Sequence, residues 1–256
     1  MKIGKANKLL DANLTYVSTV EETPGMTAVN LINPDTGAVC QYINGAGMVT
    51  IESDADIQAE YIAIFNVNIQ TSLKLELYDG STLIFTQTLT AAQLPGLGSK
   101  NALFANPAPT TDFNKIVLTT AGASPTFETV FGYIYAFDSI DFGCAENIQV
   151  ADNTNDSVTI SRTNRPDTQK RYLFQSYQIT TRKNTPFAEL QGKIREIFSL
   201  GIGSARPVIF DEPMFNPVNL VYGILDAGAA KYDVFPIKDA DGDYKSQTTV
   251  GIQEVT

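Results

Sequence analysis

The stretch Leu73-Lys74-Leu75-Glu76-Leu77-Tyr78-Asp79-Gly80-Ser81-Thr82-Leu83-Ile84-Phe85-Thr86-Gln87-Thr88-Leu89 decides the fold class. Residues 73–78 alternate with a period of two, which is the spacing of a β-strand with one buried face. Asp79-Gly80 is a turn signal, and a second apolar run follows it. The sequence therefore predicts an antiparallel hairpin of residues 73–78 and 82–89.

Similar short runs fill the rest of the first half. Runs rich in β-branched and aromatic residues predict strands at residues 48–51, 60–65, 114–119 and 127–137. Residues 60–65 are apolar enough for a central strand, and Phe131, Tyr133, Tyr135 and Phe137 are expected on one side of the last strand. Many short strands separated by turns are typical of a β-sandwich or jelly roll.

The segment between Leu94 and Asp112 is rich in Pro, Gly and Asn. This composition predicts a long surface loop at the rim of the sandwich, where binding sites are common. A tolerated insertion is the alternative interpretation.

The second half predicts a β-rich module with one α-helix. Strands are expected at residues 157–161, 171–180, 207–210, 220–225, 232–235 and 248–255. The helix is expected near residues 186–200, with Thr185 as N-cap, Pro186 at its first position and Gly201 just past its end. Its apolar stripe has helical spacing and comprises Phe187, Leu190, Ile194, Ile197 and Phe198.

Charge divides the chain of 256 residues unevenly. Residues 1–150 hold six Lys, no Arg and fifteen acidic residues, whereas all six Arg lie between Arg162 and Arg206. We therefore expect two modules, residues 1–145 and 146–256, joined near residues 145–155. One continuous domain with chance clustering is the alternative.

The composition also limits the possible chemistry. The chain has no His, so Ser–His, Cys–His and His–metal sites are excluded. The net charge of −10 argues against attraction to nucleic acid or to an anionic membrane. We expect no enzymatic activity and no cofactor.

Cys40 and Cys144 are too few for a disulfide framework, and buried free thiols are expected. No export signal is expected at the start of the sequence. The longest apolar stretch, residues 61–65, is far shorter than a membrane-spanning helix, so no membrane insertion is expected.

Two acidic patterns are candidates for function. Asp239, Asp241 and Asp243 alternate as calcium ligands can, but Gly242 stands at the fourth place instead of the sixth and no Glu closes the loop. An acidic turn is the preferred interpretation, so no metal is expected. Paired acids such as Asp211-Glu212 would be needed by a glycosidase, but neighbours on a strand point apart.

A basic cluster comprises Arg162, Arg165, Lys170 and Arg171, next to Tyr172 and Phe174. It has the residue types of a nucleic-acid strip. Arg also dominates protein interfaces because its planar fork pairs with carboxylates, which the first half supplies. An interface between subunits or modules is the preferred interpretation.

Several segments together resemble bacteriophage virion proteins with a discoidin-like, galactose-binding-like jelly roll. They are Asn7-Lys-Leu-Leu-Asp11, Val29-Asn-Leu-Ile-Asn-Pro-Asp35, Val49-Thr-Ile51, residues 59–68 and Phe131-Gly-Tyr-Ile-Tyr135. Residues 207–211 and 222–225 look like the companion region of such tail proteins. The chain has Cys40-Gln41-Tyr42 where that family often has a tryptophan, so the stacking platform for a sugar is missing there.

The resemblance implies a structural subunit of a bacteriophage tail or baseplate, located in the virion and assembled in the host cytoplasm. Its partners would be copies of itself in a closed ring and other tail proteins. The first alternative is a carbohydrate-binding module that recognises a host surface glycan. The second is a carboxylate-dependent glycan hydrolase.

Overall fold

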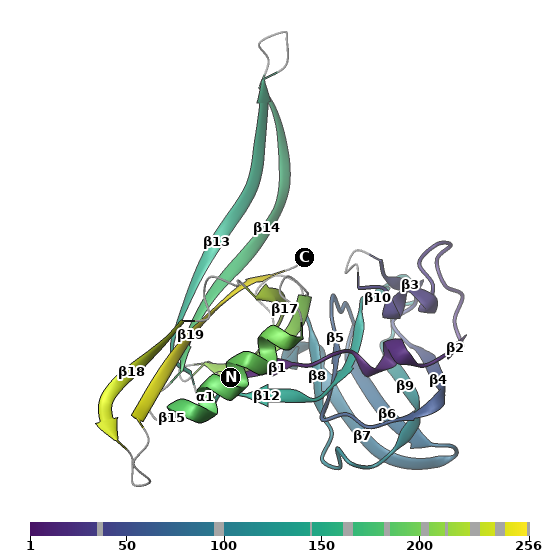
Figure 1. The fold of residues 1–256 in the computed structure, drawn as a ribbon. Helices are drawn as coiled ribbons and strands as arrows, with labels where there is room; N and C mark the ends of the chain where they lie inside the picture. The colour runs from purple at the N-terminus through teal and green to yellow at the C-terminus, as the bar shows by residue number, and fades with distance from the viewer. Residues whose placement is uncertain are drawn as a thin grey trace.

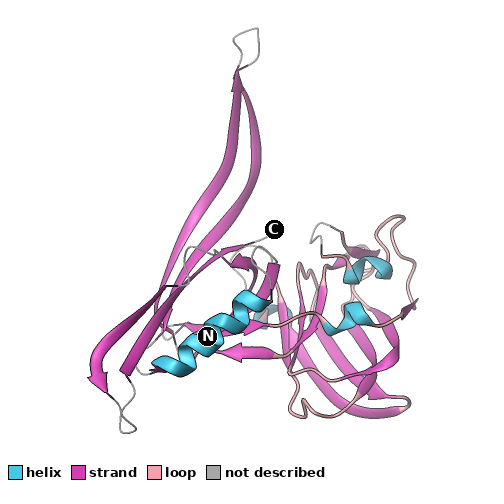
Figure 2. Cartoon of the chain, in the orientation of Figure 1, coloured by secondary structure: helices cyan, strands magenta, loops and turns pink. Residues whose placement is uncertain are grey.

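The computed structural model describes most of the chain. The described residues are 1–34, 38–94, 100–143, 145–160, 166–181, 185–200, 205–212, 215–225, 231–238 and 244–254. Antiparallel strands dominate them, and they include one α-helix (Figure 2). This confirms the predicted fold class, a mainly β chain in which a β-sandwich precedes a second β-rich module with one helix.

Two sheets form the N-terminal sandwich (Figure 1). The larger has the order β2 (Leu14–Ser18), β4 (Gly47–Ile57), β9 (Phe113–Ala121), β6 (Ser72–Asp79) and β7 (Thr82–Thr90). The smaller has the order β11 (Ile134–Phe137), β5 (Tyr61–Ile64) and β8 (Ala102–Ala105). A two-stranded pair, β10 (Glu128–Phe131) and β3 (Cys40–Ile43), and three short 3-10 helices complete the module: η1 (Lys8–Asp11), η2 (Ala28–Ile32) and η3 (Ala91–Gln93).

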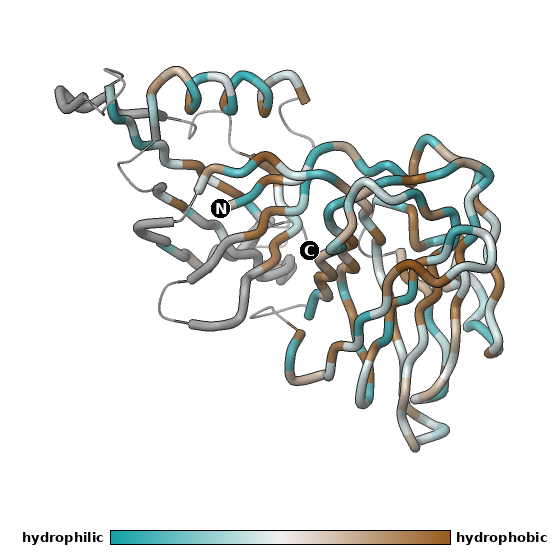
Figure 3. Tube along the Cα trace, turned by 90° about the horizontal axis from the view of Figure 1, so that it is seen from below, coloured by the Kyte–Doolittle hydropathy of each residue, from teal (hydrophilic) through white to brown (hydrophobic). Residues whose placement is uncertain are grey.

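The predicted hairpin is confirmed as β6 and β7. Leu73, Leu75 and Leu77 are fully buried in the sandwich core, as the period of two requires. Gly80 has φ of 56° in the turn, a conformation that favours glycine. Figure 3 shows the same alternation as hydrophobic and polar positions along the strands of the sandwich.

The predicted strand at residues 127–137 is instead two strands. β10 pairs with β3, and β11 pairs with β5, so the chain changes sheets at Gly132. The Gly132 N–H donates to the carbonyl of Phe65, and a Cβ at this glycine would lie 2.6 Å from that oxygen. Phe131 therefore joins the sandwich core while Tyr133, Tyr135 and Phe137 do not, which corrects the expectation that all four share one side.

The predicted loop between Leu94 and Asp112 contains a strand. β8 pairs with β5, and its Ala102 and Phe104 are fully buried. The expectation of one long surface loop is therefore wrong for residues 102–105. Four residues flanked by Pro, Gly and Asn are too short to show a strand period.

The second module is built on a nine-stranded sheet. Its main path is β12 (Ser139–Asp141), β1 (Lys2–Gly4), β16 (Ala205–Glu212), β17 (Phe215–Leu225), β19 (Tyr244–Glu254), β14 (Pro166–Thr181) and β13 (Ala145–Ile160). β15 (Thr185–Pro186) and β18 (Lys231–Lys238) also pair with β19. Residues from both ends of the predicted first module, in β1 and β12, thus lie in this sheet, and the module boundary at residue 145 remains a prediction.

The predicted helix is confirmed as α1 (Phe187–Ser199). It begins one residue later than expected because Thr185 and Pro186 pair with β19. Leu190, Ile194 and Ile197 are buried against the nine-stranded sheet. No helix among the described residues is long and apolar enough to span a membrane.

A third core joins the two modules. One face of the three-stranded sheet lies in the sandwich core, and its other face packs against β16 and β17. Buried residues of this joint core are Ala63, Phe65, Tyr133, Tyr135, Phe137, Ile209, Leu220 and Tyr222. Because β5 is covered on both faces, its sequence is apolar almost throughout, as in other doubly buried strands.

Candidate assembly interface

β13 and β14, the two longest strands, form a hairpin that is here called the arm. Each strand has 16 residues, so the arm is about 50 Å long at ~3.4 Å per residue. Figure 1 shows that it projects away from both modules, in the direction opposite to the β18–β19 hairpin. The register of the arm runs from Ala145 opposite Thr181 to Ile160 opposite Pro166.

Only the base of the arm is integrated into the sheet. β14 pairs with β19 from Ser176 to Thr180. β19 ends at Glu254, one residue past the partner of Ser176, so this pairing extends no further along β14. Among the described residues, the β14 segment 166–175 pairs with β13 alone. β13 is the terminal strand of the sheet order. Backbone edges therefore stay open on both sides of the outer arm.

An open edge of this length has a physical consequence. Two-stranded hairpins are marginally stable alone in water, and unpaired edges are templates for pairing with another chain. Among the described residues, the β14 segment 166–175 has no third strand beside it that would stabilise the outer arm within the chain. It is thus suited to gain that partner from another molecule, by addition of a strand to an edge.

Two of the four basic residues that the sequence predicts as an interface lie in the arm. Lys170 and Arg171 lie in β14, opposite Asp156 and Asn155 of β13. Arg162 and Arg165 lie outside the described residues. Whether these four residues contact a partner remains a prediction.

The sequence did not reveal the full length of the arm. The modules were expected to join near residues 145–155, so no strand was predicted over the polar stretch 151–156, and strands were expected only at 157–161 and 171–180. The structure places 151–156 inside β13. Asp and Asn are depleted in strands, so this stretch carries no strand signal, and no apolar face could have revealed it.

The candidate metal ligands Asp239, Asp241 and Asp243 lie outside the described residues. Within the described part of the chain, no group of three or more Cys, Asp or Glu side chains is placed to hold a metal ion. The acidic pair Asp211-Glu212 lies at the end of β16, where the register with β17 shifts.

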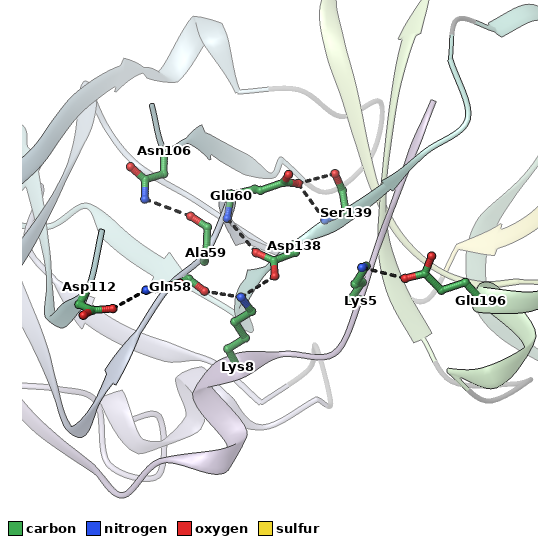
Figure 4. Close-up of polar contacts among 10 residues, drawn as sticks. All are labelled: Lys5, Lys8, Gln58, Ala59, Glu60, Asn106, Asp112, Asp138, Ser139 and Glu196. Carbon is green, nitrogen blue, oxygen red and sulfur yellow. Dashed lines mark hydrogen bonds and ion pairs between the residues drawn. The ribbon is translucent and has the colours of Figure 1, made fainter. Parts of the chain in front are cut away.

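Two other carboxylates meet where the sandwich joins the second sheet (Figure 4). Glu60 accepts hydrogen bonds from the Ser139 N–H and hydroxyl, at 2.9 and 2.6 Å. Asp138 accepts from the Glu60 N–H and forms an ion pair with Lys8 at 2.6 Å. Both carboxylates are thus engaged in holding β5 against the chain that leads into β12, which is a structural use.

The segment that replaces the family's tryptophan faces the core. Tyr42 is 1% exposed, and its hydroxyl shares a 2.6 Å hydrogen bond with the hydroxyl of Thr120. Cys40 is a buried free thiol, as predicted, and burial raises its pKa to about 12. Neither side chain is available to stack on a sugar. Cys144 lies outside the described residues.

Several of the solved structures similar to this chain are carbohydrate-binding modules or lectin domains, and another is XRCC1 bound to the catalytic domain of DNA polymerase β. A family 32 carbohydrate-binding module from C. perfringens NanJ in complex with galactose is 13% identical, with a TM-score of 0.40 over 54% of this chain and 99% of that one. The lectin domain of lectinolysin with Lewis b is 8% identical, with a TM-score of 0.42 over 53% and 99%. A GH31 module bound to GalNAc is 17% identical, with a TM-score of 0.37 over 49% and 97%.

Each of the three carbohydrate-binding or lectin neighbours is a discoidin-like, galactose-binding-like domain that matches about half of this chain. No family model matches the sequence, and no curated protein does. The virion part of the prediction therefore rests on the sequence resemblance alone.

Proposed function

We propose that this chain is a structural subunit of a multi-copy assembly and that its arm adds strands to a neighbouring copy. The observation that carries the proposal is the open edge of β14 at residues 166–175, which pairs with β13 alone among the described residues. A bacteriophage tail or baseplate, assembled in the host cytoplasm, is the assembly that the sequence resemblance implies.

Charge supports a second copy as the partner. The segment from Arg162 to Arg171 holds four basic residues and one acidic residue, Asp167. Residues 1–150 hold fifteen acidic and six basic residues. The segment 162–171 of one copy and the acidic first half of the next are therefore complementary, and complementary charge favours encounter and correct register. Repeated contacts of this heterologous kind close into a ring when the rotation between copies permits it.

The test is the size of the full chain compared with a chain whose arm is trimmed. Residues 154–173 are replaced by Asn-Gly, which joins the paired residues Asn153 and Phe174 through a two-residue turn. Sedimentation should show a concentration-dependent oligomer for the full chain and a monomer for the trimmed chain. The circular dichroism spectrum of the trimmed chain should show that it remains folded. A full chain that stays monomeric at all concentrations would contradict the proposal, and so would a trimmed chain that assembles normally.

A second candidate function is carbohydrate binding by the sandwich, and it would operate without the arm. The sugars in the solved neighbours name the first probes, which are galactose and N-acetylgalactosamine. The buried Tyr42 means that any such site would use other side chains. A glycan array and titration calorimetry on the trimmed, monomeric chain test it. Saturable binding would support this function, and the absence of binding to any glycan on the array would contradict it.

A further inference from the structure

The strand β7 leaves a long backbone edge open on the sandwich. It is a terminal strand of the five-stranded sheet and, among the described residues, it pairs with β6 alone. The open edge runs from Thr82 to Leu89, because the N–H of Thr90 donates to the side chain of Gln93 at 2.9 Å. The register with β6 shifts once, near the turn, and is regular from Phe85 onward. β7 can therefore accept a further strand along most of its length.

β7 carries none of the features that usually protect an edge strand. Soluble proteins guard such edges with charged side chains, with proline or with a short strand. β7 has nine residues and no proline, and residues 80–99 contain no charged side chain. Among the other terminal strands that the structure describes, β18 holds charged residues and Pro236, β13 holds three acidic residues, and the rest have five residues or fewer. β7 is thus the longest unguarded terminal strand of the described sheets.

The side chains of β7 would gain cover from an added strand. Leu83 is 47% exposed, and Ile84, Phe85 and Leu89 are only partly buried against the sandwich core. Burial of apolar surface favours association. Burial of a charge opposes it, but β7 has no charged side chain that would have to leave water. Both backbone pairing and apolar contact therefore favour an added strand at this edge.

The open segment of the arm, residues 166–175, fits this edge. Its ten residues match the nine of β7 in length, and its sequence includes the apolar run Tyr172-Leu173-Phe174. β7 also belongs to the acidic first half of the chain, which the basic segment 162–171 complements in charge. Figure 1 shows the outer arm and β7 at opposite ends of the molecule, so the arm reaches β7 only in another copy.

We infer that β7 is the edge to which the outer arm of a neighbouring copy adds, so that the five-stranded sheet of one copy and the arm of the next form one continuous sheet. The inference rests on the proposed function and names the surface that receives the arm. Because the donor and acceptor edges are different strands, the contact is heterologous, and repeated contacts of this kind generate a ring when the rotation closes.

Hydrogen exchange read by peptide mass spectrometry tests the acceptor directly. The full chain is compared with the chain whose arm is trimmed at residues 154–173, each in dilute solution and at concentrations where the full chain assembles. The open-edge amides of residues 82–89 should exchange about tenfold more slowly in the assembled full chain alone, because the added strand supplies their partners. β2, the other terminal strand of the same sheet, is the internal reference, and its exchange should not change.

Two threonine substitutions in the full chain give an independent test. Thr88 in β7 and Thr15 in β2 are both exposed, and they lie on the two terminal strands of one sheet. Thr88→Lys places on β7 the kind of charge that guards natural edges, so assembly should require an about tenfold higher concentration. Thr15→Lys adds the same charge to the other edge and should assemble as the parent does. The urea midpoint of each variant in dilute solution shows that it is folded, and if Thr88→Lys does not fold, the exchange experiment decides.

The outcomes separate this inference from the proposed function. If the full chain assembles and residues 166–175 gain protection while β7 does not, the arm adds to another edge, so the inference fails and the proposed function stands. Protection of β7 in the trimmed chain would also overturn the inference, because β7 would then pair with a strand other than the arm. Normal assembly of folded Thr88→Lys would count against β7 in the same way. A full chain that never assembles would overturn both.

Discussion

The rings of Phe65 and Tyr222 lie 4.8 Å apart between centroids, although one follows β5 of the sandwich and the other belongs to β17 of the second sheet. Tyr222 also contacts Tyr133 at 5.5 Å and Tyr135 at 6.2 Å. Aromatic contacts at these separations add stabilisation beyond the burial of area. The two modules therefore share a core, and a substitution on one side of it should change the stability of both.

Truncation of the shared core should destabilise the whole chain. Leu220 is 2% exposed in this core, so Leu220→Ala is expected to lower the free energy of unfolding by about 2–5 kcal/mol. Leu83 in β7 is 47% exposed, and Leu83→Ala should change it by less than ~0.5 kcal/mol. Urea unfolding measures both, and equal effects would contradict a joint core at Leu220.

Asn7 joins the start of the chain to β11. Its side chain donates to the Tyr133 hydroxyl and the Ile134 carbonyl, and accepts from the Ala136 N–H at 3.0 Å. Asn7→Ala leaves these buried groups unpaired, so a loss of about 2–4 kcal/mol is expected. The matched control, Asn13→Ala, removes one exposed side-chain hydrogen bond to Asp54 and should cost ~0.5 kcal/mol. Equal unfolding midpoints for the two variants would contradict this role.

Two glycine-to-alanine substitutions should have opposite effects on the stability of the chain. A Cβ at Gly132 would lie 2.6 Å from the Phe65 carbonyl oxygen, so Gly132→Ala must shift the backbone where the chain changes sheets and should destabilise. Gly192 lies in α1, where an added Cβ would have no atom within 4 Å, and Gly192→Ala should stabilise by about 0.5–1 kcal/mol. Thermal unfolding of both variants, read by circular dichroism, checks the sign of each change.

The joint core should lose stability in alkali. Burial raises the pKa of Tyr135 to about 12 and also raises the pKa values of Tyr133 and Tyr222 above the ordinary value near 10. A pKa that is higher in the folded state means that the unfolded chain loses its protons first. The stabilisation that these three buried, protonated hydroxyls contribute is thus complete below pH 10 and is lost between about pH 10 and pH 12.

This pH dependence is measurable as the urea midpoint between pH 8 and pH 12. The midpoint should fall above pH 10, and Tyr135→Phe, which removes one titrating group, should make the fall shallower. A midpoint that is independent of pH, or an identical slope in Tyr135→Phe, would show that these hydroxyls are not buried together.

The parts of the fold with a regular apolar period could be predicted from the sequence. The alternation of Leu73, Leu75 and Leu77 indicated the hairpin, and the spacing of Leu190, Ile194 and Ile197 indicated the helix. Residues 60–65 were predicted as a central strand, but their apolar character could not show that they are covered by a second sheet as well. That cover comes from β16 and β17, which are distant in sequence.

The candidate interface was predicted only in part. The basic cluster at Lys170 and Arg171 drew attention to the arm, but residues 151–156 have no pattern that distinguishes a strand from a linker. Their strand conformation is a consequence of pairing with residues 170–176 of β14. The sequence did not indicate that Arg206 is buried, because arginine side chains are ordinarily exposed.

The most direct test of assembly through the arm is hydrogen exchange of the β14 segment 166–175. The amides of this segment that point away from β13 should exchange rapidly in dilute, monomeric full-length protein and become protected at concentrations where the oligomer forms, because the added strand supplies the missing backbone partners. Protection that is the same at both concentrations, in a protein shown to assemble, would contradict strand addition at this edge.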